Sequence, residues 1–215
     1  MNTKNLGILV FLLCSSIGTA FASWDDALPT DFNLSAPPKN GSAITKEDYK
    51  TLHEYQDTRT EDECAYAETQ VVPTIDNMFG GYYPILSNKK LDKHRELLDH
   101  VFKFSHGITK YYKKIYQRAR PYNSDATLVP CIDREDSYSY PSGHATIGVL
   151  SACVLAQYYP EYAQELSERG IYIGQLRVIT GLHHPSDVKA GQNLGQQLCA
   201  YLFSNKDFLE DFYSE

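Results

Sequence analysis

Apolar residues recur at helical spacing along most of the chain, and strand-like alternation of apolar and polar positions is absent. Capping residues, prolines and glycines divide this pattern into stretches of helical length. We therefore predict an all-α fold, a bundle of helices joined by short connections. The first helix is expected to open on a capping box at Thr45-Lys-Glu-Asp. The expected helices span about 45–57, 61 to Pro73 or Gly80, 88–104, 107–119, 144–159, 161–180 and 187–203.

The first 22 residues do not follow this pattern. Lys4 precedes an apolar run from Leu6 to Leu13, and small residues follow up to Ala20-Phe21-Ala22. This order is typical of a secretory signal peptide, although a membrane anchor is the alternative. We expect a signal peptide at 1–22, an extended arm at 23–43 and one helical domain at 44–215. The protein would then be periplasmic or secreted, without stable membrane insertion.

Composition narrows the classes of function. The chain has 215 residues, of which 42% are hydrophobic and 22% charged, enough to bury a core in one domain. Without Lys4, 19 of the 20 basic side chains remain against 27 acidic ones, a formal net charge of −8. This acidity argues against a dedicated nucleic-acid binder.

The cysteines that follow the expected signal peptide are Cys64, Cys131, Cys153 and Cys199. In an oxidising compartment they can form two disulfides in three connectivities. Cys153 and Cys199 lie in apolar helical stretches, so buried free thiols are the alternative for that pair.

Residues with catalytic potential concentrate between Lys113 and Asp187, in three short motifs. The first is Lys113-x6-Arg120-Pro121. Residues seven apart share a helix face, and the proline places Arg120 near a helix end where the chain turns. Alone, this motif also fits a solvated basic face.

The second motif runs from Ser139 to His144 and leads into an apolar helix. Ser142 can cap that helix, and Gly143 lets the backbone approach a ligand closely. A helix N-terminus suits a phosphate or a similar oxyanion, and His144 would stand at the mouth of the pocket. The alternative is an ordinary capped helix with an incidental histidine.

The third motif places Arg177 before a turn that carries His183 and Asp187. A histidine and an aspartate four residues apart around a turn can meet, and the carboxylate would then fix the imidazole tautomer. A helix cap beside two surface histidines is the alternative.

Together, the three motifs and their spacing resemble the signature of the type 2 phosphatidic acid phosphatase superfamily, which includes class A bacterial acid phosphatases and vanadium haloperoxidases. The resemblance is strongest over 113–191 and implies the helical bundle of that superfamily. The longer match from Ser139 and the expected signal peptide favour the soluble class A branch. The chain departs from the usual pattern at Leu176, where the family has serine, and at Tyr138 and Ala145, where class A members commonly have Gly and Thr.

The resemblance implies a metal-free, two-step hydrolysis of small phosphate monoesters that releases inorganic phosphate. His183 would be the nucleophile and form a phosphohistidine, oriented by Asp187, while His144 would act as general acid and base. The phosphate oxygens would be bound by Lys113, Arg120, Ser142, Gly143 and Arg177. No metal or cofactor is implied, and vanadate would inhibit. An acidic pH optimum is expected, and the oligomerisation common among class A members suggests a homo-oligomer.

Neighbouring residues are assigned by their position relative to the motifs. His184 lacks an aspartate four residues later and is placed at the pocket rim, and Lys110 and Lys114 lack the spacing to Arg120. Tyr122 and Tyr140 are expected at the substrate entrance. Surface or packing roles are expected for His53, His94, His100 and His106.

Four alternative functions are weighed against the phosphatase. A vanadate-dependent haloperoxidase would use the same anion pocket, but the chain is short for that group. A serine hydrolase using Ser142 would need a G-x-S-x-G elbow, which the sequence lacks. A metallophosphatase would need a cluster of His and Asp ligands. A secreted anion-binding protein without activity would not need every charged and histidine position of the motifs.

Overall fold

The computed structural model describes residues 24–25 and 28–214, so the expected signal peptide at 1–22 lies outside the described residues. The described chain is helical and contains no strand, which confirms the all-α prediction. In chain order its elements are α1 (Ala43–Thr58), α2 (Glu61–Glu68), α3 (Ile75–Phe79), α4 (Asn88–Asp92), α5 (Arg95–Tyr116), α6 (Pro121–Ser124), α7 (Gly143–Tyr158), the 3-10 helix η1 (Pro160–Tyr162), α8 (Ala163–Ile179), α9 (Pro185–Leu202) and α10 (Lys206–Ser214).

Several helix boundaries differ from those expected. Ser42, and not Thr45, caps α1, because its side chain accepts a hydrogen bond from the Thr45 amide at 3.2 Å. The helices expected at 88–104 and 107–119 are instead a short α4 and a long α5 that continues through Gly107. The helix that begins at Glu61 ends well before Pro73, and α6 and α10 were not expected.

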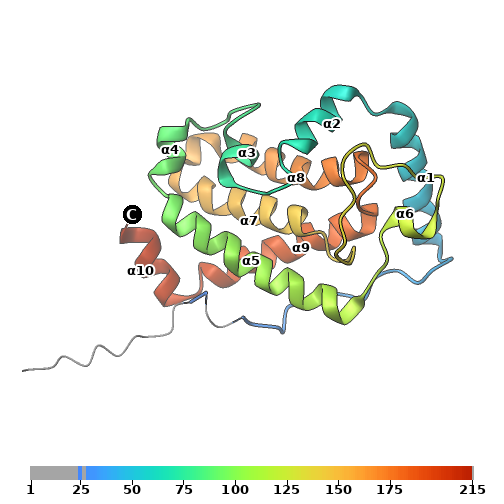
Figure 1. Cartoon of the computed structure of the whole chain (residues 1–215). Helices are drawn as coiled ribbons and strands as arrows, with labels where there is room; N and C mark the ends of the chain where they lie inside the picture. The colour runs from blue at the N-terminus through green and yellow to red at the C-terminus, as the bar shows by residue number, and fades with distance from the viewer. Residues whose placement is uncertain (1–23, 26–27, 215) are drawn as a thin grey trace, which may run out of the picture.

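The centre of the bundle is α7, which packs against α8, α9 and α5 (Figure 1). Most of its residues are buried, as expected of a helix that is apolar on all sides. The backbones of α7 and α8 approach closely at Gly148 and Gly170. A Cβ atom on Gly148 would lie only 2.7 Å from the Gly170 carbonyl oxygen.

The segment before α1 lies along α5 and contains no helix in its described residues, 28–42. The hydroxyl of Tyr112 donates to the carbonyl oxygens of Thr30 and Phe32, at 3.0 and 3.2 Å. Trp24 is buried and donates through Nε1 to Asp211 of α10 at 2.8 Å. Within the described residues, no helix combines the length and apolar character needed to cross a bilayer.

Two disulfides link distant parts of the chain. Cys64–Cys131 joins α2 to the connection between α6 and α7, and Cys153–Cys199 joins α7 to α9. The structure thus selects one of the three connectivities, and the free-thiol alternative for Cys153 and Cys199 was wrong.

Candidate active site

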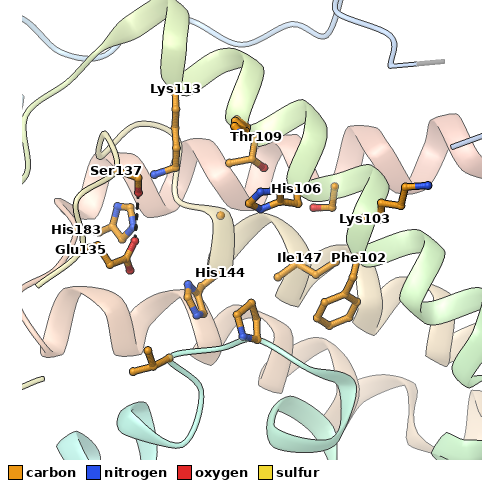
Figure 2. A pocket seen from close by; sticks show the side chains of 15 residues that line it. Phe102, Lys103, His106, Thr109, Lys113, Glu135, Ser137, His144, Ile147 and His183 are labelled. Atoms are coloured by element: carbon orange, nitrogen blue, oxygen red, sulfur yellow. Dashed lines mark hydrogen bonds between the residues drawn. The ribbon is translucent and has the colours of Figure 1, made fainter. Parts of the chain in front are cut away.

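A cavity of about 670 Å³ opens between α5, the N-terminus of α7 and the connection from α6 to α7. Figure 2 shows Lys113, Glu135 and His183 gathered at one end of this cavity. Phe102 and Ile147 line the other end (Figure 2). The cavity therefore has a charged end and an end with apolar side chains, where Lys103 also lies (Figure 2).

Lys113 and Arg120 reach the charged end from two elements and do not share one helix face. Lys113 lies in the last turn of α5, which ends at Gln117 in a left-handed conformation (φ 45°). Arg120 is the extended residue that precedes α6, and its side chain is buried. The helix expected at 107–119 ends earlier, at Tyr116, so the shared helix face predicted for Lys113 and Arg120 does not form, whereas the turn predicted near Arg120 does. Burial, with Arg120 nearby, lowers the pKa of Lys113 to about 7.

The Arg120 guanidinium contacts the expected nucleophile directly. Its Nη1 lies 2.9 Å from Nε2 of His183 and also donates to the Leu182 carbonyl oxygen at 3.0 Å. A guanidinium can only donate, so Nε2 of His183 accepts and the ring proton is on Nδ1. The lone pair of Nε2 therefore faces the cationic end of the cavity.

Asp187 lies on the opposite side of the His183 ring, with Oδ2 at 3.4 Å from Nδ1. Burial, followed by the nearby Arg120, lowers the pKa of His183 to about 3. Burial alone would raise the pKa of Asp187, but hydrogen bonds from His183 and His184 hold it well below its usual range. The pair is thus a neutral imidazole oriented by an ionised carboxylate.

The second motif forms the start of α7. Ser142 is its N-cap and accepts from the Ala145 amide at 3.4 Å, as expected. Gly143 is the first helical residue and lines the cavity. A Cβ atom there would meet only the Thr109 methyl group, at 3.6 Å, so the wall beside Gly143 is open.

His144 also lines the cavity and has a fixed tautomer. Its Nε2 lies 2.7 Å from the Gln70 carbonyl oxygen, which can only accept, so Nε2 carries a proton. Burial, followed by the charge of Arg177, lowers the pKa of His144 to about 3.

Arg177 is fully buried in the last turn of α8. Its Nη2 donates to the Ala67 carbonyl oxygen at 2.9 Å, while Nε and Nη1 have no hydrogen-bond partner among the described residues. Burial lowers the pKa of Arg177 to about 10, so it remains a cation at neutral pH. Leu176, which stands where the family has serine, packs in an apolar cluster with Tyr66 and Tyr122 and is therefore part of the core.

Three further polar residues complete the site and were not foreseen. Arg118 donates to Asp187 at 2.6 Å and to Asp48 of α1 at 3.1 Å. Glu135 lies inside the cavity and contacts Arg120. Arg118 stands two residues before Arg120, a position from which it could have been predicted. Asp48 belongs to the expected capping box, which gives it a helix-capping role and not a place in the site, and nothing in the local sequence marks Glu135.

Some neighbouring residues lie elsewhere than expected. His184 is buried behind Asp187, 3.1 Å from its Oδ2, and not at the pocket rim. Tyr122 and Tyr140 are buried and donate to the carbonyl oxygens of Glu135 and Ser35, so neither forms the entrance. His106, expected to lie outside the site, lines the cavity (Figure 2).

The structure thus brings together all the motif residues predicted from sequence. Lys113, Gly143, His144 and His183 line one cavity, Arg120 and Asp187 contact His183, Ser142 caps the helix at its wall, and the charge of Arg177 acts on His144. Among the described residues, no group of three or more His, Cys, Asp or Glu side chains could hold a metal ion. The arrangement is complementary to an oxyanion.

Comparison with known proteins shows which proteins this chain resembles. The model of the PAP2 superfamily matches residues 101–208. A non-specific acid phosphatase of Salmonella typhimurium is 30% identical over 184 residues, which cover 81% of this chain and 74% of that protein. One of Providencia stuartii is 31% identical over 186 residues, with the same coverage. A lipid A 1-phosphatase of Rhizobium johnstonii is 31% identical over 96 residues, 43% of this chain and 39% of that protein.

Solved structures share the fold at lower identity. A bacterial vanadium-dependent iodoperoxidase superposes with a TM-score of 0.62 at 14% identity, covering 80% of this chain and 52% of that one. A transmembrane PAP2-type phosphatidylglycerolphosphate phosphatase from Bacillus subtilis superposes with a TM-score of 0.56 at 19% identity. The match covers 77% of this chain and 87% of that one. The expected class of enzyme, an acid phosphatase, agrees with the names of the relatives that match most of this chain. With a family model across half of its length and relatives that match most of it, the chain belongs to the PAP2 superfamily, as its three motifs predicted.

Proposed function

We propose that this protein hydrolyses phosphate monoesters through a phosphohistidine on His183. The observation that carries the proposal is the setting of that ring, with Nε2 facing Arg120 and Nδ1 directed at Asp187. This leaves a neutral, oriented nucleophile beside cations that can bind a phosphate. The names of the relatives, non-specific acid phosphatases, support the same class of reaction.

In the first step, Nε2 of His183 attacks phosphorus, and the bond between phosphorus and the ester oxygen breaks. The ring becomes positively charged, which Asp187 stabilises through Nδ1. Lys113, Arg120 and Arg177 bind the phosphoryl oxygens as negative charge spreads over them, together with Ser142 and the Gly143 amide. The unpartnered nitrogens of Arg177 are available for this.

His144 is the proposed proton donor and acceptor. Because its Nε2 proton is held by the Gln70 carbonyl, Nδ1 is the nitrogen that gains and loses the catalytic proton. Protonated Nδ1 delivers its proton to the leaving alkoxide. The same nitrogen then removes a proton from water, whose oxygen attacks the phosphohistidine and releases inorganic phosphate.

The apolar end of the cavity accepts the alcohol part of the substrate. Phe102 and Ile147 lie there, so an aryl phosphate is a suitable test substrate (Figure 2). We propose that the reaction needs no metal or other cofactor and that vanadate inhibits it. Turnover that survives EDTA is expected. Halide oxidation with added vanadate would instead favour the haloperoxidase alternative.

The proposed setting is outside the cytoplasm. The sequence at 1–22 has the order of a signal peptide, the arm would follow at 23–43 and the catalytic domain at 44–215. N-terminal sequencing of the exported protein is expected to begin at Ser23. An unprocessed N-terminus would contradict this assignment. A homo-oligomer remains a prediction that analytical ultracentrifugation tests.

The decisive experiment compares wild type with His183→Ala on an aryl phosphate. Loss of the nucleophile is expected to lower kcat by about 10⁴-fold or more. Rapid quench into alkaline denaturant should trap, in wild type, a phosphoenzyme that is stable in alkali and lost on acid treatment, and none in the variant. His53→Ala, a half-buried histidine outside the cavity, is the matched control and should keep full activity. Unchanged turnover in His183→Ala would refute the mechanism.

The role of His144 is tested by leaving-group dependence. A poor leaving group such as an alkoxide needs protonation, whereas 4-nitrophenolate does not. His144→Asn is therefore expected to lower kcat/KM, which reports formation of the phosphohistidine, about 100-fold or more for an alkyl phosphate and much less for 4-nitrophenyl phosphate. Equal losses for both substrates would show that His144 does not donate the proton.

A further inference from the structure

Glu135 places an acidic side chain within the cationic end of the cavity. Its Oε2 accepts from Nη2 of Arg120 and lies 3.4 Å from the Ser137 hydroxyl oxygen. Arg120 uses its other terminal nitrogen to contact His183, at 2.9 Å. Nη2 of Arg120 is thus occupied by a carboxylate, and it also donates to the Ser137 hydroxyl oxygen at 2.9 Å.

The surroundings of Glu135 are those proposed for phosphate. Lys113, His144 and His183 line the same cavity. Burial alone would raise the pKa of Glu135, but Arg120, followed by His183 and His144, lowers it to about 2. The side chain is therefore an anion under any condition in which the enzyme would work, held where the site binds anions.

The backbone at Glu135 is fixed, whereas its side chain is free to leave. The Tyr122 hydroxyl donates to the Glu135 carbonyl oxygen at 2.9 Å and accepts from the Glu135 amide at 3.1 Å. The Glu135 side chain keeps 32% of its surface exposed, although Arg120 beside it is almost fully buried. Rotation about side-chain bonds can move the carboxylate toward solvent without refolding the connection.

We propose that the Glu135 carboxylate occupies the phosphate subsite of the free enzyme and that an incoming phosphate group displaces it. Glu135 then sets affinity: it weakens the binding of substrate and of inorganic phosphate alike. Because Lys113 lines the cavity and Arg120 contacts Glu135, a competing carboxylate offsets part of the attraction of these cations for phosphate and favours release of the product. The part that concerns turnover rests on the proposed phosphatase function, while the part that concerns phosphate binding does not.

The test is Glu135→Gln, which keeps the shape of the side chain and removes its charge. Calorimetric titration with inorganic phosphate is expected to give about tenfold tighter binding than wild type, because phosphate no longer has to break a charge-assisted hydrogen bond between Arg120 and a carboxylate. The matched control is Asp136→Asn, the same charge change on the adjacent exposed residue, which should bind like wild type. Phosphate binding by Glu135→Gln that equals wild type, is weaker or is absent would overturn the proposal.

Two further measurements test the competition by Glu135 and distinguish its failure from a failure of the proposed phosphatase function. In an active enzyme, Glu135→Gln should lower KM and the inhibition constant of phosphate together, by a similar factor. If no variant hydrolyses phosphate esters, the calorimetric difference still tests the competition. A crystal structure of wild type with vanadate is expected to show Glu135 away from Arg120. Vanadate bound with the Glu135–Arg120 contact intact would overturn the proposal even if Glu135→Gln failed to fold.

Discussion

His144 and His183 carry the same kind of side chain, but one hydrogen-bond partner fixes a different tautomer in each. Arg120 can only donate, so it leaves Nε2 of His183 as a lone pair. The Gln70 carbonyl can only accept, so it fixes a proton on Nε2 of His144. At the residue scale, the roles proposed for the two histidines, nucleophile and acid, depend on these partners.

The pH dependence of activity follows from the environment of His144. Burial and Arg177 lower its pKa to about 3, so its protonated fraction falls as pH rises above that value. A bound phosphate anion favours the charged ring and raises this pKa. The descending limb of kcat, which reports the complex, should therefore lie at higher pH than that of kcat/KM, which reports the free enzyme. A pH–rate profile checks this order, and a maximum above about pH 8 would contradict the acidic optimum.

Arg118 is predicted to hold the orienting carboxylate in place. It bridges Asp187 at 2.6 Å and Asp48 at 3.1 Å, and all three side chains are buried. Arg118→Met leaves two buried carboxylates without their cation and should cost about 3–5 kcal/mol of the free energy of unfolding. The variant should also lose kcat, because Asp187 is then free to shift. Urea unfolding and kcat are the measurements, with exposed Lys114→Met as the control. Wild-type stability in Arg118→Met would contradict the prediction.

At the element scale, close helix packing positions the phosphate site. Gly191 of α9 faces the start of α7, where a Cβ atom would collide with the Ser142 carbonyl oxygen. The Ser142 amide also donates to the Asp187 carbonyl oxygen at 3.0 Å. The second and third motifs are therefore joined through backbone contacts between two helices.

Gly191→Ala is predicted to push α9 away from α7. The backbone oxygen cannot rotate aside as a side chain would, so we expect a loss of about 1–3 kcal/mol in the free energy of unfolding. Phosphate affinity should fall as well, because Ser142 and Gly143 move relative to Asp187. Gln196→Ala, at an exposed position on the same helix, is the control both for urea unfolding and for calorimetric titration with phosphate. Equal stability of the two variants would show that the contact is not tight.

The sequence predicts what depends on neighbours in the chain. The Ser142 cap and the pairing of His183 with Asp187 involve residues three or four apart. The continuation of α5 through Gly107 does not follow from local signals, because the Leu28 side chain packs over that glycine.

The polar contacts made by Asp48 and Glu135 around the site could not be predicted from the sequence either. Asp48 meets Arg118 across 70 residues. Glu135 contacts Arg120 because of the course of the irregular connection between α6 and α7, on which Glu135 lies. The proposed nucleophile and the cations beside it could thus be predicted from motifs, while their contacts with Asp48 and Glu135 could be found only in the fold.

At the scale of the whole molecule, a local positive site lies within an acidic chain of net charge −7. Hydrogen bonds and a disulfide between residues far apart in the sequence hold peripheral segments against the helices. The arm is bonded to Tyr112 of α5, and Cys64–Cys131 fastens the connection that carries Glu135. These links hold parts of the site that lack regular structure.

The Cys64–Cys131 bond is predicted to act on both stability and affinity. It spans 67 residues, so replacing both cysteines with alanine should cost about 4 kcal/mol in the free energy of unfolding. The Cys153–Cys199 bond spans 46 residues and joins two helices of the core, so its removal should cost about as much. Only the first variant loosens the connection that bears Glu135 and Ser137, so only its KM should change. Denaturant unfolding and KM for both double variants separate the two effects. An equal change of KM in both would show that affinity follows global stability and not the position of that connection.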